Sequence, residues 1–551
     1  MELLLFETSW MDVWNGRAPT EPVGAIFTKP EIVSLILDLA GYKPRSHRLA
    51  DQRLLEPSCG DGAFLSEIVR RLLESERVQR GAVDWSNRQL DSAITACDLN
   101  HGFVLLARSR TCEQLQVEGC GPARAAELAE GWIQHTDFLL ANWTKLYDFV
   151  VGNPPYVRIE DLPPAVLQRY RELYKTCTDR ADLYVAFFEK GLRLLSSPGC
   201  LAFISANRFA KNLYGTALRK MIARDYRVRH FLNLEHTQPF ASDVSAYPCI
   251  TVIDRQRGEP TLASTLTDLE PETLAAVRSL VEIGHVGLMA KFPVWYLDGA
   301  PWIATARKSY DLLVSLEARL TLLEDSAPDT KVGIGVATGA DRVFVSKGLV
   351  ESVEPECQMP LVMAGDVQPK ELTWSGHYLI NPFSAADDGS LRDFDAFAGL
   401  AAYFERHREA LMKRHVAKKR PDGWFRAIDR VTASLLPKAK LVIPDIQAGG
   451  VIGLDTGRFY PHHNVYWITS SGWDLRVLQA LLRSSFVTEQ VRAFSVEMRG
   501  GSIRYQAQVL RKVRLPAESS LSADLKERLA SLSASDDQSA IDAAAQLAFG
   551  S

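Results

Sequence analysis

At 551 residues the chain is several times longer than one typical domain of about 100 to 200 residues, so it has room for two or three domains. Its 46% apolar and 24% charged residues are ordinary for a globular protein and exclude collagen-like, coiled-coil and disordered classes. The 63 Lys and Arg against 67 Asp and Glu give a net charge of -4, which argues against a wholly basic nucleic-acid binder but allows a local basic cleft.

The apolar runs and the cysteines exclude further classes. The longest apolar runs fall well short of the roughly 18 residues that a membrane span needs, so we expect no membrane contact. The first residues, MELLLFETSWMDVW, lack a basic leader and a cleavage site, which argues against a secretory signal. Eight scattered cysteines form no C-x-x-C pair, so we expect neither a disulfide framework nor a metal site. The default is a reduced cytoplasmic protein.

Short apolar strands alternate with helical patterns in the first half, as in a parallel sheet covered by helices. One expected helix runs from about Ala181 to Leu195, before Pro198 and Gly199. The expected strands are 53–57, 92–99, 147–155, 200–206, 229–235 and 248–254.

The second half lacks this strict alternation and is predicted to be a separate α+β module. Its Gly-punctuated strands are expected at 331–339, 341–346, 440–446, 449–454 and 464–470. The predicted organisation is a catalytic domain over 1–255, a linker or helical connection over 256–329, a second domain over 330–516, and a mobile tail over 517–551.

Three signals follow one another at the ends of predicted strands. The segment LLEPSCGDGAF is a strand and a tight turn in which Gly60 and Gly62 let the backbone approach a ligand. It lacks the Lys-Ser/Thr of a phosphate-binding loop. Asp98 ends the next strand, where a carboxylate can receive both hydroxyls of a ribose. Further on, Asp137 can accept an exocyclic amine and Phe138 can cover a purine face. Each signal alone is also typical of an ordinary connection, and only their order indicates a nucleoside site.

The phrase YDFVVGNPPYVRIEDLP is the most specific motif. Two successive prolines cannot donate to a sheet ladder, so they end the strand and form a rigid turn. Asn153 is then held on a stiff support, with Tyr156 directly after the turn. An aromatic ring beside an amide and free carbonyls suits a planar base that carries an amine. A turn that merely ends a strand needs neither Asn nor Tyr.

With FTKPEIVSLI and DLYVAFFEKGLRLLSSPGCLAFISANRF, these motifs resemble the gamma-class, TaqI-like DNA adenine methyltransferases over about residues 20 to 255. A weaker resemblance to the specificity domain of that family runs through GVATGADRVFV, MAGDVQPKEL, KLVIPDI and HHNVYWIT to about Pro516. The resemblance implies a Rossmann-like α/β domain that depends on S-adenosylmethionine, followed by an α+β DNA-specificity domain. It implies methyl transfer to the exocyclic amine of an adenine flipped out of double-stranded DNA.

The resemblance also assigns roles to individual residues. The methionine part of the cofactor would lie against Thr28, Glu56, Pro57, Ser58, Cys59 and Gly60, its ribose against Asp98, and its adenine against Asp137, Phe138 and Phe187. The catalytic turn would be Asn153, Pro154, Pro155 and Tyr156. Asn153 and the Pro154 carbonyl would accept the hydrogens of the target amine, while Tyr156 and Phe240 stack on the target base.

A local basic stretch is a candidate DNA surface. Residues 401–440 carry eleven Lys or Arg against four acids, and Trp424 and Phe425 interrupt the charges. Because phosphate neutralisation is the main sequence-independent source of DNA affinity, we expect Lys418, Lys419 and Arg420 to line a DNA cleft. The alternative is an ordinary solvated helical face.

Several other functions remain open at this level. A protein-glutamine methyltransferase can use the same turn, but it does not need some 250 further residues with a basic stretch. Cytosine-amine methylation needs the same chemistry, and Asn before Pro-Pro favours adenine within the resemblance. An RNA amine methyltransferase and a DNA-binding module without catalysis also remain.

The resemblance implies a setting as well. We expect a bacterial restriction-modification system in which the chain protects host DNA, paired with a separate restriction endonuclease. We further expect a monomer located in the cytoplasm and associated with the nucleoid through DNA.

Overall fold

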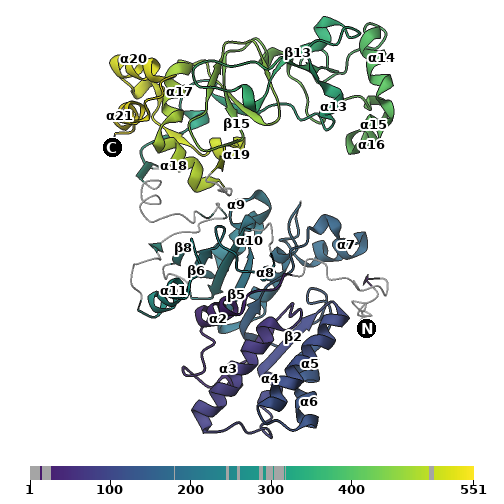
Figure 1. The fold of residues 1–551 in the computed structure, drawn as a ribbon, viewed down its shortest axis with the longest axis vertical. Coiled ribbons are helices and arrows are strands. Elements are labelled where there is room, and N and C mark those ends of the chain that lie inside the picture. Colours follow the sequence, from purple (N-terminus) through teal and green to yellow (C-terminus); the bar gives the residue numbers. More distant parts are fainter. Residues whose placement is uncertain are drawn as a thin grey trace, which may run out of the picture. The chain divides into compact units, whose positions relative to one another are not determined.

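The computed structural model describes residues 13–14, 26–178, 180–242, 247–256, 261–283, 290–292, 299, 302, 315–316, 318–495 and 502–550. The chain divides into two compact units, Met1–Arg307 and Lys308–Ser551 (Figure 1). Among the described helices, none is long and apolar enough to cross a bilayer.

The first unit is an α/β domain whose described strands form one nine-stranded sheet. The strands are β1 (Leu54–Glu56), β2 (Ile94–Asp98), β3 (Ile133–His135), β4 (Tyr147–Gly152), β5 (Leu195–Ala206), β6 (Arg227–Asn233), β7 (Pro248–Asp254), β8 (Thr261–Thr265) and β9 (Ala290–Phe292). The helices are α2 (Pro30–Ala40), α3 (Ala63–Arg80), α4 (Leu90–Ala93), α5 (His101–Val117), α6 (Pro122–Trp132), α7 (Pro164–Leu173), α8 (Tyr184–Arg193), α9 (Arg208–Lys211), α10 (Thr216–Asp225) and α11 (Pro271–Ile283). Short 3₁₀ helices are η1 (Leu49–Asp51), η2 (Ile159–Asp161) and η3 (Leu213–Gly215).

The strand order is β3-β2-β1-β4-β5-β7-β6-β8-β9. Strands β3, β2, β1, β4 and β5 are parallel, so the carboxyl ends of β1, β2, β3 and β4 meet at one edge. Chain order reverses between β1 and β4, and in such sheets ligands bind at that point, outside the carboxyl ends. The backbone fold alone therefore indicates that a ligand binds at the edge beyond Glu56, Asp98 and Gly152.

Alternate residues of the central strands face opposite helical layers, because side chains in a strand alternate between its two faces. Phe149, Val151 and Ala202 join one buried cluster with residues of α2 and α3. On the other face α8 comes close to the sheet, since a Cβ added at Gly191 would lie 2.8 Å from Leu201 Cδ1. Both faces of β4 and of residues 200–206 in β5 are thus covered, which explains the largely apolar sequence of these stretches.

Two sequence predictions for this unit are corrected. The sheet is not wholly parallel, because β7 lies antiparallel between β5 and β6. The predicted linker over 256–329 begins instead with elements of the first unit. Strand β8 pairs in parallel with β6, and α11 packs against α2. The polar sequence around β8 concealed a strand of the sheet that lies between β6 and β9.

The second unit is an α+β module, as predicted, with two four-stranded sheets in the orders β11-β19-β15-β17 and β12-β14-β13-β18. Its strands are β10 (Thr321–Leu322), β11 (Lys331–Ile334), β12 (Val345–Lys347), β13 (Gln358–Val362), β14 (His377–Ile380), β15 (Lys440–Pro444), β16 (Ile446–Gln447), β17 (Gly453–Asp455), β18 (Tyr460–Pro461), β19 (Val465–Thr469), β20 (Ile503–Arg504) and β21 (Arg514–Leu515). Its helices are α13 (Asp341–Phe344), α14 (Ala398–Arg406), α15 (Arg408–Met412), α16 (His415–Lys419), α17 (Leu475–Arg483), α18 (Ser485–Phe494), α19 (Ala507–Leu510), α20 (Ala523–Leu532) and α21 (Gln538–Phe549). The 3₁₀ helices are η4 (Leu323–Asp325), η5 (Pro355–Cys357), η6 (Ala364–Asp366), η7 (Pro421–Gly423), η8 (Ala433–Leu435) and η9 (Glu518–Ser520).

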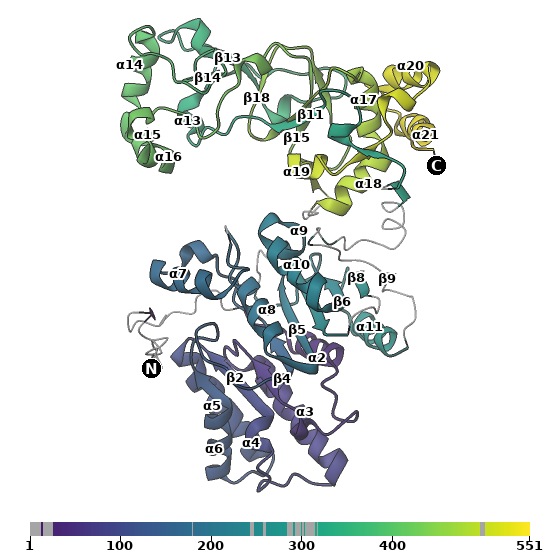
Figure 2. The same ribbon diagram turned by 180° about the vertical axis from the view of Figure 1, so that it is seen from behind.

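The prediction of a mobile tail after residue 516 is wrong. That stretch folds into α20 and α21, which Figure 2 shows beside α17. Leu529, Ala544 and Phe549 are buried in the same cluster as residues of β15 and β19. Small residues at helical spacing give only a weak apolar pattern. The Ser/Ala-rich composition therefore did not indicate that one face of each helix is packed. The predicted strand at 341–346 is likewise split into α13 and β12.

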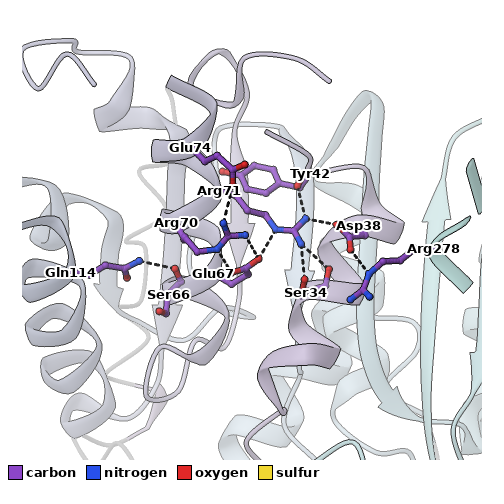
Figure 3. A network of polar contacts seen from close by, with 10 residues as sticks. All are labelled: Ser34, Asp38, Tyr42, Ser66, Glu67, Arg70, Arg71, Glu74, Gln114 and Arg278. Atoms are coloured by element: carbon purple, nitrogen blue, oxygen red, sulfur yellow. Dashed lines mark hydrogen bonds and ion pairs between the residues drawn. The ribbon is translucent and has the colours of Figure 1, made fainter. Parts of the chain in front are cut away.

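A buried polar network joins α2, α3 and α11 (Figure 3). The Arg71 guanidinium, on α3, donates to Asp38 Oδ1 at 2.8 Å, to Glu67 Oε1 at 2.8 Å and to the carbonyls of Tyr42 and Ser34. Arg278, on α11, donates to Asp38 Oδ2 at 2.7 Å. Arg71 thus donates to the polar groups at the end of α2. The Asp38 carboxylate connects α2 with α3 and α11.

We expect Arg71→Met to lower the free energy of unfolding by roughly 2 to 3 kcal/mol, because it leaves buried carbonyls without their donor. Arg70→Met is the matched control: Arg70 pairs with the same Glu67 but its side chain is 50% exposed, against 4% for Arg71. The control should cost under about 1 kcal/mol. Urea unfolding measures both variants, and equal losses would contradict this account of the network.

Candidate active site

A cavity of about 340 Å³ opens at the indicated edge of the first unit. All ten residues predicted to bind a cofactor line it. They are Thr28, Glu56, Pro57, Ser58, Cys59, Gly60, Asp98, Asp137, Phe138 and Phe187. Asn153, Pro154 and Pro155 of the predicted catalytic turn line it too. The structure therefore brings together, around one space, residues that are up to 159 positions apart in the sequence.

The glycine turn after β1 is fixed by Asp98. The Gly60 N–H donates to Asp98 Oδ2 at 2.9 Å, and the Asn100 N–H donates to Asp98 Oδ1 at 2.8 Å. Gly60 has φ +52° and Gly62 has φ +92°, conformations that side chains with a Cβ disfavour. The sequence prediction that glycine allows a close backbone approach here is consistent with this geometry.

The described lining of the cavity is acidic. It contains Glu56, Asp61, Asp98, Asp137 and Asp161 and no Lys, Arg or His. Burial raises the pKa of Glu56 well above its usual range, and the charges of Asp98 and Asp61 add to the shift. Burial also raises the pKa of Asp98, although backbone N–H groups partly oppose the rise. Such carboxyl groups gain most from a ligand that brings positive charge.

Asp137 is engaged by four donors within the protein. Its Oδ1 accepts the N–H groups of Leu139 and Leu140, and its Oδ2 accepts Trp14 Nε1 at 2.9 Å and the Tyr170 hydroxyl at 2.6 Å. Trp14 and Tyr170 also line the cavity, and the sequence analysis did not identify them. No motif marks Trp14, because it lies far ahead of the first strand. Apolar spacing around Tyr170 indicates only an ordinary helix.

Phe138 and Phe187 form the aromatic wall of the cavity. Their ring centroids are 5.0 Å apart, and the Lys190 ammonium lies 5.3 Å from the Phe138 centroid. Lys190 donates to the carbonyls of Leu139 and Ala141, and burial lowers its pKa to about 8. The lysine thus supports the wall from behind and is not part of the lining.

The turn after β4 is held from two sides. The Ser58 hydroxyl donates to the Asn153 carbonyl at 3.0 Å, which ties this turn to the glycine turn. The Asn153 amide nitrogen donates to the Ile26 carbonyl at 2.7 Å and to Thr28 Oγ1 at 3.2 Å. Asn153 Oδ1 is buried and has no partner among the described groups. A fixed amide that leaves its oxygen unsatisfied is a ready acceptor for a ligand N–H.

Tyr156 and Phe240 lie together beside this turn and outside the cavity lining. Their rings meet edge to face at 6.0 Å, and Tyr156 also lies 6.2 Å from Tyr184. Burial raises the pKa of Tyr156 well above its usual range. Phe240 is only 2% exposed and belongs to the main core. It therefore supports Tyr156 in this structure and has no open face for stacking.

The segment that carries Phe240 pairs with the segment that carries Thr28. Thr28 and Phe240 form an antiparallel bridge, the Lys29 N–H donates to the Pro239 carbonyl, and the Ala241 N–H donates to the Phe27 carbonyl. Thr28 is thus fixed where its hydroxyl meets the Asn153 amide. The segments that carry Thr28, Asn153 and Phe240 are far apart in the sequence but are direct neighbours in the structure.

The predicted basic surface of the second unit is smaller than its sequence suggests. Lys418, Lys419 and Arg420 are exposed at the end of α16. Trp424 and Phe425, expected in the wall of a cleft, are each 7% exposed and belong to a hydrophobic core. Lys440 is buried and paired with Asp455 at 2.8 Å. The aromatic part of the prediction is therefore wrong, because those rings stabilise the fold.

The fold and the site geometry define a methyltransferase domain joined to a second module, and known proteins agree with this class. The family model described as Eco57I restriction-modification methylase matches residues 105–240. That range contains the Asn-Pro-Pro-Tyr turn.

Similarity to named relatives extends over almost the whole chain. Type II methyltransferase M.PaeR7I of Pseudomonas aeruginosa is 40% identical, with 93% of this chain and 88% of the relative covered. M.BstVI of Geobacillus stearothermophilus is 39% identical over 92% of each chain. M.XhoI of Xanthomonas vasicola is 38% identical over 96% of this chain and 97% of the relative. The chain belongs to the Type II methyltransferases of restriction-modification systems.

A solved structure supports the fold of both units. The Type IIL restriction-modification enzyme MmeI in complex with DNA matches with a TM-score of 0.61 at 15% identity, covering 98% of this chain and 76% of that chain. The predicted class, a Rossmann-like methyltransferase domain followed by an α+β module, is thereby confirmed.

The cofactor of this class is S-adenosylmethionine, and the cavity fits its chemistry. A ligand with an ammonium and a sulfonium group suits a cavity whose described lining has carboxylates and no basic side chain. An adenine ring suits the space beside Phe138 and Phe187, and Gly60 leaves room for close approach. The residues present therefore fit the group that the family implies.

Proposed function

We propose that the chain transfers a methyl group from S-adenosylmethionine to the exocyclic amine of an adenine flipped out of double-stranded DNA at a specific sequence. The observation that carries this proposal is the buried Oδ1 of the cavity-lining Asn153, which has no hydrogen-bond partner among the described groups. It is held there because the Asn153 amide nitrogen donates to two acceptors, the Ile26 carbonyl and Thr28 Oγ1. Membership of the Type II methyltransferases supports DNA as the substrate.

The Asn-Pro-Pro turn can activate a weak nucleophile. The lone pair of an adenine amine is delocalised into the ring. It must therefore be localised on the nitrogen before the amine can attack a methyl group. Asn153 Oδ1 would accept one N–H and the Pro154 carbonyl the other, which favours a pyramidal nitrogen. Because the prolines make the turn rigid, both acceptors are preorganised and catalysis rests on position and polarity. Bound S-adenosylmethionine would supply the electrophilic methyl group.

The cavity residues would hold the cofactor in the roles expected from the sequence. Glu56 and the turn through Gly60 would meet the methionine part, and Asp98 the ribose hydroxyls. Phe138 and Phe187 would cover the adenine. Trp14 extends this set, because it lines the cavity and donates to Asp137. Asp137 already accepts four donors, so a cofactor amine would have to replace or share one of them.

The flipped base would stack on Tyr156. Extrusion from a duplex costs a few kcal/mol, and stacking on an aromatic side chain offsets part of that cost. Phe240 would act from behind by packing edge-on against the Tyr156 ring. Direct stacking of Phe240 on the base would need the ring to be uncovered, since it is buried in the core.

The second unit would bind DNA and provide sequence specificity. Lys418, Lys419 and Arg420 are the exposed charges that we propose as phosphate contacts. An RNA or protein-glutamine substrate is disfavoured because relatives over the full length are Type II methyltransferases. Cytosine remains the closest rival, because only the shape of the base pocket distinguishes it. The unpartnered Asn153 oxygen argues against a DNA-binding module without catalysis.

The same proposal includes the biological setting. The chain would act as a monomer in the bacterial cytoplasm, associated with the nucleoid through DNA. It would protect host sites from a separate restriction endonuclease.

Asp98→Ala should weaken S-adenosylmethionine binding by roughly 10-fold or more, because a hydrogen bond to a charged group contributes about 1.5 to 3 kcal/mol. Isothermal titration with the purified chain measures the affinity. Asp84→Ala is the control, since the exposed Asp84 carboxylate lies outside the cavity lining and accepts hydrogen bonds from the Ser86 N–H and hydroxyl. Unchanged affinity in Asp98→Ala would remove Asp98 from the ribose role.

Asn153→Ala should bind cofactor normally yet lose methyl transfer by about 100-fold or more, as when one preorganised polar group is removed. Thr28→Val, which removes one acceptor of the Asn153 amide, should cause a smaller loss. Sequencing that detects modified bases, applied to DNA from expressing cells, should find N6-methyladenine at one sequence for the parent chain and not for Asn153→Ala. If the sequencing finds modified cytosine instead, cytosine is the substrate. Normal turnover by Asn153→Ala would contradict the mechanism.

Changing Lys418, Lys419 and Arg420 to Ala should weaken DNA binding and make it less dependent on salt. Each lost phosphate contact lowers the slope of log K against log salt by about 0.9. Arg528→Ala, an exposed cation on α20, is the control and should leave the slope unchanged. A slope that does not change in the triple variant excludes these residues as phosphate contacts.

A further inference from the structure

Three side chains with metal-binding atoms meet in the second unit, apart from any residue assigned above. Asp341 begins α13, and His462 and His463 connect β18 to β19. Asp341 Oδ2 lies 3.2 Å from His462 Nε2 and 4.0 Å from His463 Nδ1. One ligand atom from each residue falls within 4.8 Å of the others.

These separations are close to those of ligands around one ion. Nitrogen and oxygen ligands lie about 2.0 to 2.2 Å from Zn²⁺, so two ligands of a tetrahedral site are about 3.3 Å apart. Two imidazoles and one carboxylate form a donor set that Zn²⁺ and similar divalent transition ions accept. Small rotations of the exposed side chains would bring all three atoms to that spacing.

Hydrogen bonds within the cluster do not account for all of its polar atoms. His462 is 2% exposed, yet its Nδ1 has no hydrogen-bond partner among the described groups, and the same holds for the buried Nδ1 of His463, whose contact with Asp341 is longer than a hydrogen bond. The contact between His462 Nε2 and Asp341 satisfies only one ring nitrogen. Buried nitrogens without a partner are uncommon in folded proteins and need an explanation.

The surroundings already orient the carboxylate. The Thr338 hydroxyl donates to Asp341 Oδ1, which directs Oδ2 toward the two rings. Such outer contacts are typical of metal ligands, because they fix the ligand before the ion binds. Asp341 and His463 side chains are 45% and 36% exposed, so an ion and its water ligands have access from solvent.

We propose that Asp341, His462 and His463 bind one divalent transition ion, with Zn²⁺ favoured, and that solvent completes its coordination.

The ion would fasten the loop before α13 to the connection between β18 and β19. That loop is also tied to the basic segment: Arg414 donates to the Thr338 carbonyl, and Asp429 exchanges two hydrogen bonds with Ala337. Asp341 and His462 are 121 residues apart, so the ion would close a long loop of the second unit. Its role would be to stabilise the part of the unit that presents the proposed phosphate contacts.

The test is metal binding by the full-length purified chain, stripped with a chelator and then dialysed against Zn²⁺. Mass spectrometry of the metal content should find one equivalent per chain, and Zn²⁺ should raise the melting temperature. Titration with Co²⁺ should produce the visible absorption of a nitrogen- and oxygen-coordinated ion. These readouts are independent of methyl transfer, so they can fail while the proposed function holds.

His463→Ala and Asp341→Asn alter exposed ligands and should weaken Co²⁺ binding by about 100-fold or more, since loss of even a supporting contact costs 10- to 100-fold. His415→Ala, an exposed histidine on α16, is the matched control and should bind normally. The proposal is overturned if the parent chain retains no stoichiometric metal, or if His463→Ala binds Co²⁺ as tightly as the parent.

Discussion

The hydrogen bonds that hold Asn153 fix the geometry on which the candidate active site depends. Ser58 holds its carbonyl, while Ile26 and Thr28 hold its amide nitrogen, so two separate segments converge on one residue. The amide oxygen is left unsatisfied by this arrangement and not by chance exposure. In the proposed mechanism, this rigid acceptor beside the end of β1 would let a methyl donor and a target amine meet.

The sheet topology explains why this convergence occurs where it does. Parallel β1, β2 and β4 place their carboxyl ends at one edge, and the reversal of chain order between β1 and β4 opens a space there. Carboxyl groups such as Glu56, Asp98 and Asp137 line the cavity, whereas the Asn-Pro-Pro-Tyr turn provides neutral acceptors and an aromatic ring. In the proposed mechanism, the same edge would present negative charge to a cationic methyl donor and neutral acceptors to an uncharged amine.

The site could be predicted from sequence where a local motif determines it. Pro154 and Pro155 end a strand in any context, and Asp98 follows a buried strand, so their placement could be read from the sequence. Features that depend on tertiary contacts could not. Trp14 meets Asp137 across 123 residues, β7 inserts antiparallel between its neighbours, and Trp424 is core although charges surround it in sequence. The Asp341 cluster was missed for the same reason, since its histidines are adjacent but their carboxylate partner is distant.

The most direct measurement is a structure of the chain with duplex DNA and a cofactor analogue that cannot transfer its methyl group. The account predicts one adenine outside the helix, its amine within hydrogen-bond distance of Asn153 Oδ1 and the Pro154 carbonyl, and Tyr156 against the ring. An extruded base whose amine contacts neither acceptor, or a cofactor bound away from Asp98, would contradict it.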